Sequence, residues 1–256
     1  MNIANIIKSL FNLERKIDIK SLPSQGLFYK DDFKITIKRA NLNDIKEYEK
    51  DYINNDASLV IEKLKKIVKK NSKFSSNYNF DDIKSIDIIF IFLEIVKFTK
   101  GKSIKIKYFN ENTNKEENIE FSSTYFNYFK IGDDLLSKYN NELKEFNIDG
   151  YRFTLPSVGV ENCLYNYLMN KSGDEDSHIY AKYNYNFLYF LSGKRKITTS
   201  EIENLVQIFN FDMGVDEQNK IKNIIKIFKP LNEYSLKKEG KVISLNSKIN
   251  LEKIWR

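Results

Sequence analysis

The stretch that decides the fold is IKSIDIIFIFLEIVKF, residues 83–98, the richest apolar run of the chain. Lys84, Asp87, Glu94 and Lys97 interrupt it at spacings that leave an apolar stripe along a helix. These charges keep the run short of the ~20 uninterrupted apolar residues that a membrane span requires. The run therefore predicts a buried helix in a globular protein.

The residues before this helix predict a strand, two helices and a loop. Phe33, Ile35 and Ile37 alternate with polar residues, which is the period of a half-buried strand. Caps, periodicity and composition then predict a helix from Asn43 or Asp44 to Tyr52, a helix over 57–70, a polar loop over 71–79, and acidic residues Asp81–Asp82 at the start of the central helix.

The residues after this helix, which Gly101 ends, predict a hairpin and then mostly helices. The expected elements are hairpin strands at 104–108 and 119–121, a helix over 133–146, a strand over 151–155, and helices over 159–171, 178–192, 199–210 and 215–228, with weak alternation over 242–251. Thr198 and Glu201 form a candidate capping box. The fold class is therefore α+β, helix-dominated, with small antiparallel sheet elements and a helical C-terminal half.

Three regions are expected along the chain. Residues 1–20 form an N-terminal amphipathic arm, residues 21–149 an α+β region with a hairpin, and residues 150–256 a mainly helical region with a C-terminal tail. The apolar positions of the arm have helical spacing: Ile3, Ile6, Ile7, Leu10 and Phe11. No flexible linker marks the division near residue 150.

Composition bounds the class of function. The formal net charge of +7 suggests nucleic-acid binding. Only five of the 42 basic residues are arginine, however, and the lysines are scattered, so this composition argues against a nucleic-acid site. The 19 Phe and 16 Tyr favour a partner-rich surface. A single cysteine permits no intramolecular disulfide and fits a reducing compartment. With no signal peptide visible, a soluble protein made in the cytosol is expected.

The residues offer little catalytic chemistry. Cys163 and His178 are the only residues of their kinds, so no zinc tetrad of Cys and His is expected, and Cys163 lies in an apolar helical pattern that favours a structural role. Gly101-Lys102-Ser103 lacks the preceding glycine and the strand-to-helix context of a P-loop. Paired acidic residues such as Asp133–Asp134 mark helix starts and turns. We expect no catalytic residue, no metal and no cofactor.

A five-residue pattern occurs twice. Leu22-Pro23-Ser24-Gln25-Gly26 returns 133 residues later as Leu155-Pro156-Ser157-Val158-Gly159. In each copy Leu anchors to the core, Pro restricts φ, Ser bonds local backbone and Gly permits a positive φ. Two sharp changes of chain direction explain the pattern as well as a duplication does.

The first copy carries a resemblance to a known family. It continues to Tyr29, then to the strand at 33–38 and to Arg39 before a polar helix start. This resembles the opening of the baseplate hub family of T-even-like bacteriophages, with its Leu-Pro-Ser-x-Gly-x-x-Tyr element. The later order is also similar over about residues 20–230, including a helix that carries Asp87 before an apolar run. The Cys pairs found in the central hairpin of some relatives are absent.

The resemblance implies a non-enzymatic role in the tail baseplate, as a component or an assembly factor of the central hub, in contact with other hub proteins and the tape-measure protein. The implied location is the virion, and the host cytoplasm during assembly, without a membrane. We expect partner contacts at the arm (Ile3, Ile6, Ile7, Leu10, Phe11), the first motif (Leu22, Pro23, Ser24, Gly26, Phe28, Tyr29), Arg39 and Trp255. The alternatives are a nucleic-acid-binding module and an unrecognised carboxylate hydrolase.

Overall fold

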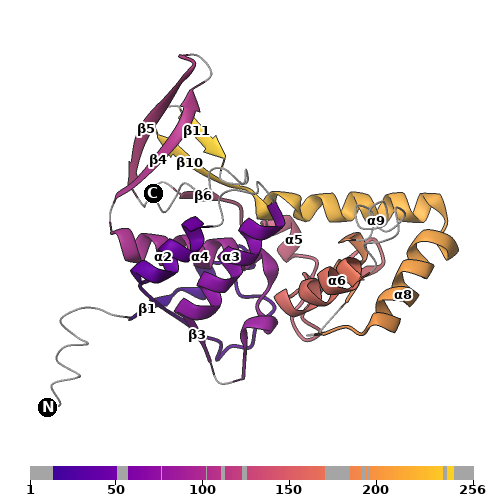
Figure 1. The fold of residues 1–256 in the computed structure, drawn as a ribbon. Helices are drawn as coiled ribbons and strands as arrows, with labels where there is room; N and C mark the ends of the chain where they lie inside the picture. Colours follow the sequence, from indigo (N-terminus) through magenta and orange to yellow (C-terminus); the bar gives the residue numbers. More distant parts are fainter. Residues whose placement is uncertain are drawn as a thin grey trace, which may run out of the picture.

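The computed structural model describes residues 14–50, 57–75, 77–101, 103–110, 113–122, 126–170, 185–191, 194, 196–238 and 241–244. The described residues form an α+β fold with seven α-helices and several small antiparallel sheets (Figure 1), which confirms the predicted fold class. The helices are α2 (Leu42–Lys50), α3 (Ala57–Asn71), α4 (Ser85–Lys100), α5 (Asp133–Leu136), α6 (Val158–Asn170), α8 (Thr199–Gln207) and α9 (Val215–Phe228).

The strands of the described residues form four small sheets. The first has the order β1-β2-β3 (Glu14–Ile17, Ile35–Lys38, Ser72–Phe74), and the second is the hairpin β4-β5 (Ser103–Asn110, Lys115–Ser122). The third has the order β7-β8-β9 (Tyr139–Asn140, Glu145–Ile148, Tyr151–Phe153), and the fourth β11-β10-β6 (Lys241–Ser244, Tyr234–Lys238, Phe126–Tyr128). Short helical turns lie between the helices and strands: η1 (Ile19–Ser21), η3 (Phe80–Asp82), η5 (Tyr185–Phe190), η6 (Ile208–Asp212) and η7 (Lys229–Asn232).

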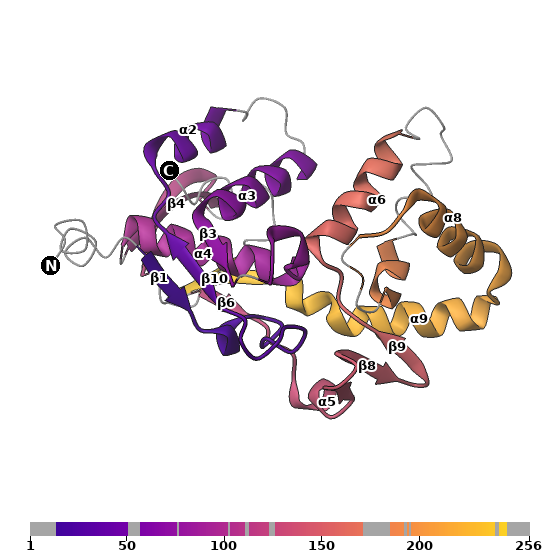
Figure 2. The ribbon, with the colours of Figure 1, turned by 90° about the horizontal axis from the view of Figure 1, so that it is seen from below.

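Helix α4 lies at the centre of the packing, as its apolar sequence predicts. Nine of its residues are buried, because α3 and the β1-β2-β3 sheet pack on it while its first turn contacts the C-terminal half. Ile86 belongs to a cluster with Phe146, Phe153 and Phe228, whereas the rest of the helix packs with residues of β2 and α3. A third cluster joins α6, η5 and α8. Figure 2 shows the helices α6 and α8 in the same part of the molecule.

Several predicted elements differ in the structure. Residues 72–74 of the expected polar loop form β3, because they pair with β2. The helix expected over 133–146 is only α5 followed by β7 and the start of β8. Helix α2 is capped by Asn41, whose amide oxygen accepts a hydrogen bond from the Asp44 nitrogen at 2.9 Å, and not by Asn43 or Asp44. Asp81 and Asp82 lie in η3, so the acid in the first turn of α4 is Asp87.

The position of the expected division near residue 150 is a tight turn. Asp149 and Gly150, with φ of 53° and 84°, connect β8 to β9, where Ile148 pairs with Tyr151. This is the geometry of a two-residue type I′ hairpin, for which Asp-Gly is a favoured sequence. The segment joins two paired strands and contributes to one cluster of the core.

Candidate protein-binding groove

The first Leu-Pro-Ser element is attached to α4 through the carboxylate of Asp87. The Ser24 backbone nitrogen donates to Asp87 Oδ1 at 3.0 Å, and the Ser24 hydroxyl donates to Oδ2 at 2.7 Å. The Tyr29 hydroxyl also donates to Oδ2, at 2.8 Å, and accepts a hydrogen bond from the Lys84 nitrogen at 2.9 Å. Ser24 and Asp87 are fully buried. Three donors thus compensate for the burial of one carboxylate.

The second element contacts the same end of α4. The Ser85 nitrogen donates to the Pro156 carbonyl at 3.0 Å, and the Val158 nitrogen donates to the Ile83 carbonyl at 2.8 Å. The Lys84 ammonium donates to the Leu155 carbonyl at 2.6 Å. The two copies therefore converge on one helix terminus. They are not equivalent, since Gly26 has φ +77° whereas the second glycine, Gly159, lies inside α6.

Burial sets the electrostatics of this cluster. It raises the pKa of Asp87 to about 6, against the opposing effects of the Ser24 and Tyr29 hydrogen bonds and the positive charge of Lys84. It also lowers the pKa of Lys84 to about 8 and raises that of Tyr29 well above its ordinary value. Because every one of these groups bonds to the chain itself, we assign the cluster a structural role.

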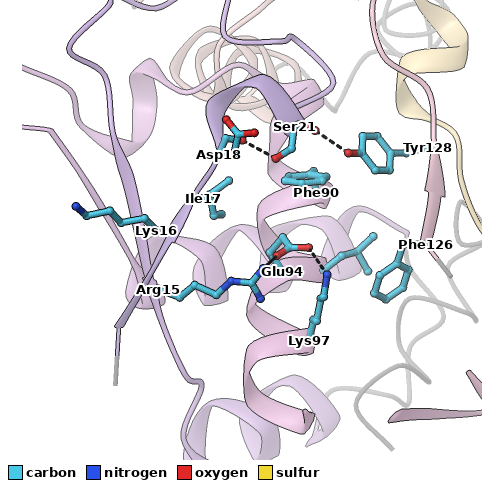
Figure 3. Close-up of a pocket in the computed structure, with 11 residues that line it drawn as sticks. Arg15, Lys16, Ile17, Asp18, Ser21, Phe90, Glu94, Lys97, Phe126 and Tyr128 are labelled. Atoms are coloured by element: carbon cyan, nitrogen blue, oxygen red, sulfur yellow. Dashed lines mark hydrogen bonds and ion pairs between the residues drawn. The ribbon is translucent and has the colours of Figure 1, made fainter. Parts of the chain in front are cut away.

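Beside this cluster lies a groove of about 410 Å³, enclosed by β1, η1, α4 and β6 (Figure 3). Phe90 of α4 lies at its apolar floor, and Phe126 and Tyr128 of β6 form one wall. Leu93 of α4 also lines it. The centres of the Phe90 and Tyr128 rings lie 5.0 Å apart, and the Tyr128 hydroxyl donates to the Ser21 carbonyl at 2.8 Å. The wall of β6 is thereby held against η1.

The charged side of the groove is centred on Glu94. Its carboxylate lies 3.1 Å from the Arg15 guanidinium and 3.3 Å from the Lys97 ammonium, and its side chain is only 13% exposed. Two cations around one largely buried carboxylate leave a positive excess at this rim, which Lys16 increases and Asp18 offsets. The groove thus combines aromatic surface with ionic groups at its edge, as protein-binding sites commonly do.

The two strands that line the groove are sheet edges within the described part of the chain. There, β1 pairs only with β2, and β6 pairs only with β10. Residues 15–18 line the groove consecutively, so the groove meets β1 along its edge, whereas β6 contributes the alternate residues of one face. An unpaired strand edge exposes backbone donors and acceptors to which an extended segment can pair.

The predicted partner-binding residues fall into three groups. Ile3, Ile6, Ile7, Leu10, Phe11 and Trp255 lie outside the described residues. Leu22, Pro23, Ser24 and Tyr29 are buried. Gly26 and Phe28 are half-buried, and Arg39 is exposed, with its guanidinium 5.2 Å from the centre of the Phe98 ring.

Burial changes the interpretation of the first motif. Leu22, Pro23, Ser24 and Tyr29 are buried within this chain, so their side chains do not contact a partner directly. Ser24 and Tyr29 instead bond to Asp87. Phe28 is half-buried with its ring edge-on to Tyr139, 5.5 Å away. The motif therefore stabilises the fold at the start of α4, next to the groove.

The residues of the groove itself were not predicted from the sequence. Arg15, Phe90, Glu94, Phe126 and Tyr128 come from three separate segments that only the fold brings together. A usable signal was present at Asp87 and Glu94, because an acidic residue in an otherwise apolar helix must find a partner when it is buried. The identity of those partners cannot be read from the helix alone.

Other candidate chemistry is sparse in the described residues. Cys163 is only half-buried, and it packs against the apolar cluster of α6 and α8. His178 lies outside the described residues. Among the residues with assigned positions, no group of three or more His, Cys, Asp or Glu side chains could hold a metal ion. The same residues include no helix of the length and hydropathy required to cross a bilayer.

Comparison with known proteins returned no match to any family model, any curated protein or any solved structure.

Proposed function

We propose that this chain is a non-enzymatic, protein-binding component or assembly factor of a phage baseplate hub. The groove between β1 and β6 is the observation that carries the protein-binding part of the proposal. Among the described residues it offers a strand edge that pairs with no further strand, an aromatic wall and an ionic rim within one depression. These features suit an extended segment of another protein better than a small ligand.

The assignment to the hub rests on the resemblance, and the structure shows how three of the residues that carry it are packed. Ser24, Tyr29 and Asp87, three residues that carry the likeness, form one hydrogen-bonded unit. Each residue type has a physical reason at its position, since only hydroxyl or N–H donors can satisfy the buried carboxylate.

We propose that a partner segment adds as a strand to the outer edge of β1 and rests on Phe126 and Tyr128. The backbone of β1 would supply the hydrogen bonds, and the aromatic wall would accept apolar side chains. The candidate partners are other hub proteins and the tape-measure protein, as the resemblance implies. The location proposed is the tail baseplate, with the host cytoplasm as the site of assembly.

The first experiment is mass spectrometry of purified phage particles together with a pull-down of the tagged full-length chain from infected cells. Presence in particles at a few copies would identify a hub subunit. Absence from particles, with hub or tape-measure proteins recovered in the pull-down, would identify an assembly factor. If neither result is obtained, the hub assignment is wrong.

The groove is tested in the same pull-down with a charge reversal at its rim. Arg15→Glu adds an anion beside Glu94, so we expect at least a several-fold loss of the recovered partner. Lys46→Glu is the matched control, because Lys46 is exposed on α2 and the net charge changes equally. Equal loss with both variants would indicate a general charge effect and would exclude the groove as the binding site.

A further inference from the structure

The connection between α8 and α9 exposes a group of large apolar side chains. We call residues 199–219, from the start of α8 through η6 to the first turn of α9, the elbow; it lies at the opposite end of the molecule from β1 (Figures 1 and 2). Ile208, Phe211 and Val215 are 48%, 62% and 72% exposed. Three large exposed apolar residues within eight positions concentrate apolar surface in one place, whereas single exposed apolar residues are ordinary on protein surfaces.

The elbow is also strongly acidic in a basic chain. It contains five Asp and Glu residues and no Lys or Arg, whereas the whole chain has a net charge of +7. Asp212 and Asp216 directly follow Phe211 and Val215 in the sequence, and both are exposed. Glu203 and Glu217 are exposed as well. Glu201 is paired with Lys194 at the far end of the elbow, whereas Asp212 and Asp216 place negative charge next to the exposed apolar residues in the sequence.

The backbone of the elbow is held in place from within. The Gln218 side-chain amide donates to the Phe209 carbonyl at 2.8 Å and to the Met213 carbonyl at 3.2 Å. Phe209 itself is 3% exposed and anchors η6 to the interior. A buried anchor next to exposed Ile208 and Phe211 means that the exposed side chains are presented by an ordered turn. Ordered apolar side chains bind with a smaller loss of entropy than mobile ones do.

We infer that the elbow is a docking site for a basic amphipathic helix of a partner protein. Charge complementarity identifies this occupant: apolar side chains of the helix cover Phe211 and Val215, and its Lys or Arg residues meet Asp212 and Asp216. A π-helical turn such as η6 interrupts the regular helix here and is frequent at functional positions. The site is distinct from the groove, so it stands whether or not the hub assignment is correct.

The inference is tested with the full-length chain and two labelled peptide probes of about 18 residues, one with Leu and Lys at amphipathic spacing and one with Glu in place of Lys. Binding is followed by fluorescence anisotropy. We expect the basic probe to bind, and the acidic probe to bind at least 10-fold more weakly. Affinity for the basic probe should fall several-fold between about 50 and about 300 mM salt, since rim charges are screened.

Two variants localise the binding. Phe211→Ser should weaken the basic probe at least 10-fold, while Phe129→Ser, at a comparably exposed phenylalanine (55%) outside the elbow, should leave it unchanged. The double variant D212N/D216N should weaken the probe and flatten its salt dependence. All four positions are exposed, so folding is retained. Sedimentation of the wild-type chain is measured in parallel.

Three outcomes would overturn the inference. Equal binding of the basic probe to wild type and Phe211→Ser would place it elsewhere. Equal affinity for the acidic probe would remove the argument from charge. Self-association that Phe211→Ser abolishes, without binding of either probe, would make the occupant a second copy of this chain.

Discussion

At the scale of single residues, the burial of Asp87 shapes the neighbourhood of the first motif. Its carboxylate is enclosed where two distant segments meet α4, and Ser24 and Tyr29 supply the hydrogen bonds that make the burial tolerable. Gly26 completes the turn that aims Ser24 at this carboxylate. The set of three donors around one buried acid therefore stabilises the fold of this molecule.

Gly26 is required both for its backbone conformation and for space. It has φ +77°, and a Cβ there would lie 2.3 Å from Ile19 Cγ2. We expect Gly26→Ala to lower the free energy of unfolding by about 2–3 kcal/mol. Gly150→Ala meets the same positive φ (+84°) in open space and should cost only about 1 kcal/mol. Chemical denaturation of both variants measures the difference. An equal loss of the free energy of unfolding in both variants would show that Ile19 moves away from the new methyl group at no cost.

The raised pKa of Asp87 makes part of the stability depend on pH. The folded protein holds this proton up to about pH 6, whereas the unfolded carboxyl titrates near 3.8. The stabilisation that comes from protonated Asp87 is therefore fully present below pH 3.8. It is lost as the pH rises through 6, and the free energy of unfolding falls by up to about 3 kcal/mol. The stability advantage of wild type over Asp87→Asn should shrink correspondingly between pH 4 and 7. Parallel pH profiles in urea denaturation would show that Asp87 does not titrate in this range.

At the scale of elements, helix termini and turns carry clear local signals. Thr198 caps α8 by accepting a hydrogen bond from the Glu201 nitrogen at 3.3 Å, and the Glu201 side chain accepts from the Thr198 nitrogen at 2.8 Å. The predicted capping box is thus confirmed. The Asp149-Gly150 turn of β8 and β9 carried a comparable signal, but the helical periodicity of the preceding residues concealed the hairpin.

Removal of this cap should destabilise α8 locally. Thr198→Ala deletes the hydroxyl that satisfies the first turn, so we expect a loss of about 1 kcal/mol in the free energy of unfolding. Amide hydrogen exchange should become faster in α8 first. Thr199→Ala, one residue inside the helix, keeps the cap and is the control, with an expected change within about 0.5 kcal/mol. A comparable loss in both variants would mean that the cap contributes little.

At the scale of the whole molecule, the N-terminus of α4 connects the two halves. The core around α4 includes Val158 and Tyr234 from the second half, and the Tyr234 hydroxyl donates to the Ile86 carbonyl at 3.0 Å. Charge is distributed unevenly over this unit, since the acidic elbow lies in a chain of net charge +7. Opposite ends of the molecule thus present different chemistry to partners.

Because both halves depend on this junction, we expect them to unfold together. Lys84→Met removes the ammonium that donates to the Leu155 carbonyl. The loss of this hydrogen bond should lower the free energy of unfolding by about 1–3 kcal/mol. Native-state hydrogen exchange should then show equal loss of protection in α4, β9 and α9. Lys46→Met, at an exposed site, should change little. Two separate transitions, with only one displaced by Lys84→Met, would contradict a single cooperative unit.

The sequence by itself determined the elements whose signals are local. The apolar period of residues 83–98 specified a buried helix, the alternation at 33–37 specified β2, and Gly101 specified the end of α4, where φ is 85°. These signals arise from neighbours within one or two turns, so they can be read without knowledge of the fold.

Only the tertiary structure decided which distant residues meet. Strand β3 exists because it pairs with β2, and Asp87 is tolerated because Ser24, 63 residues away, bonds to it. The groove likewise needs β1, α4 and β6 at once. Short strands and buried charges are stabilised by partners remote in the chain, and no local period encodes the identity of those partners.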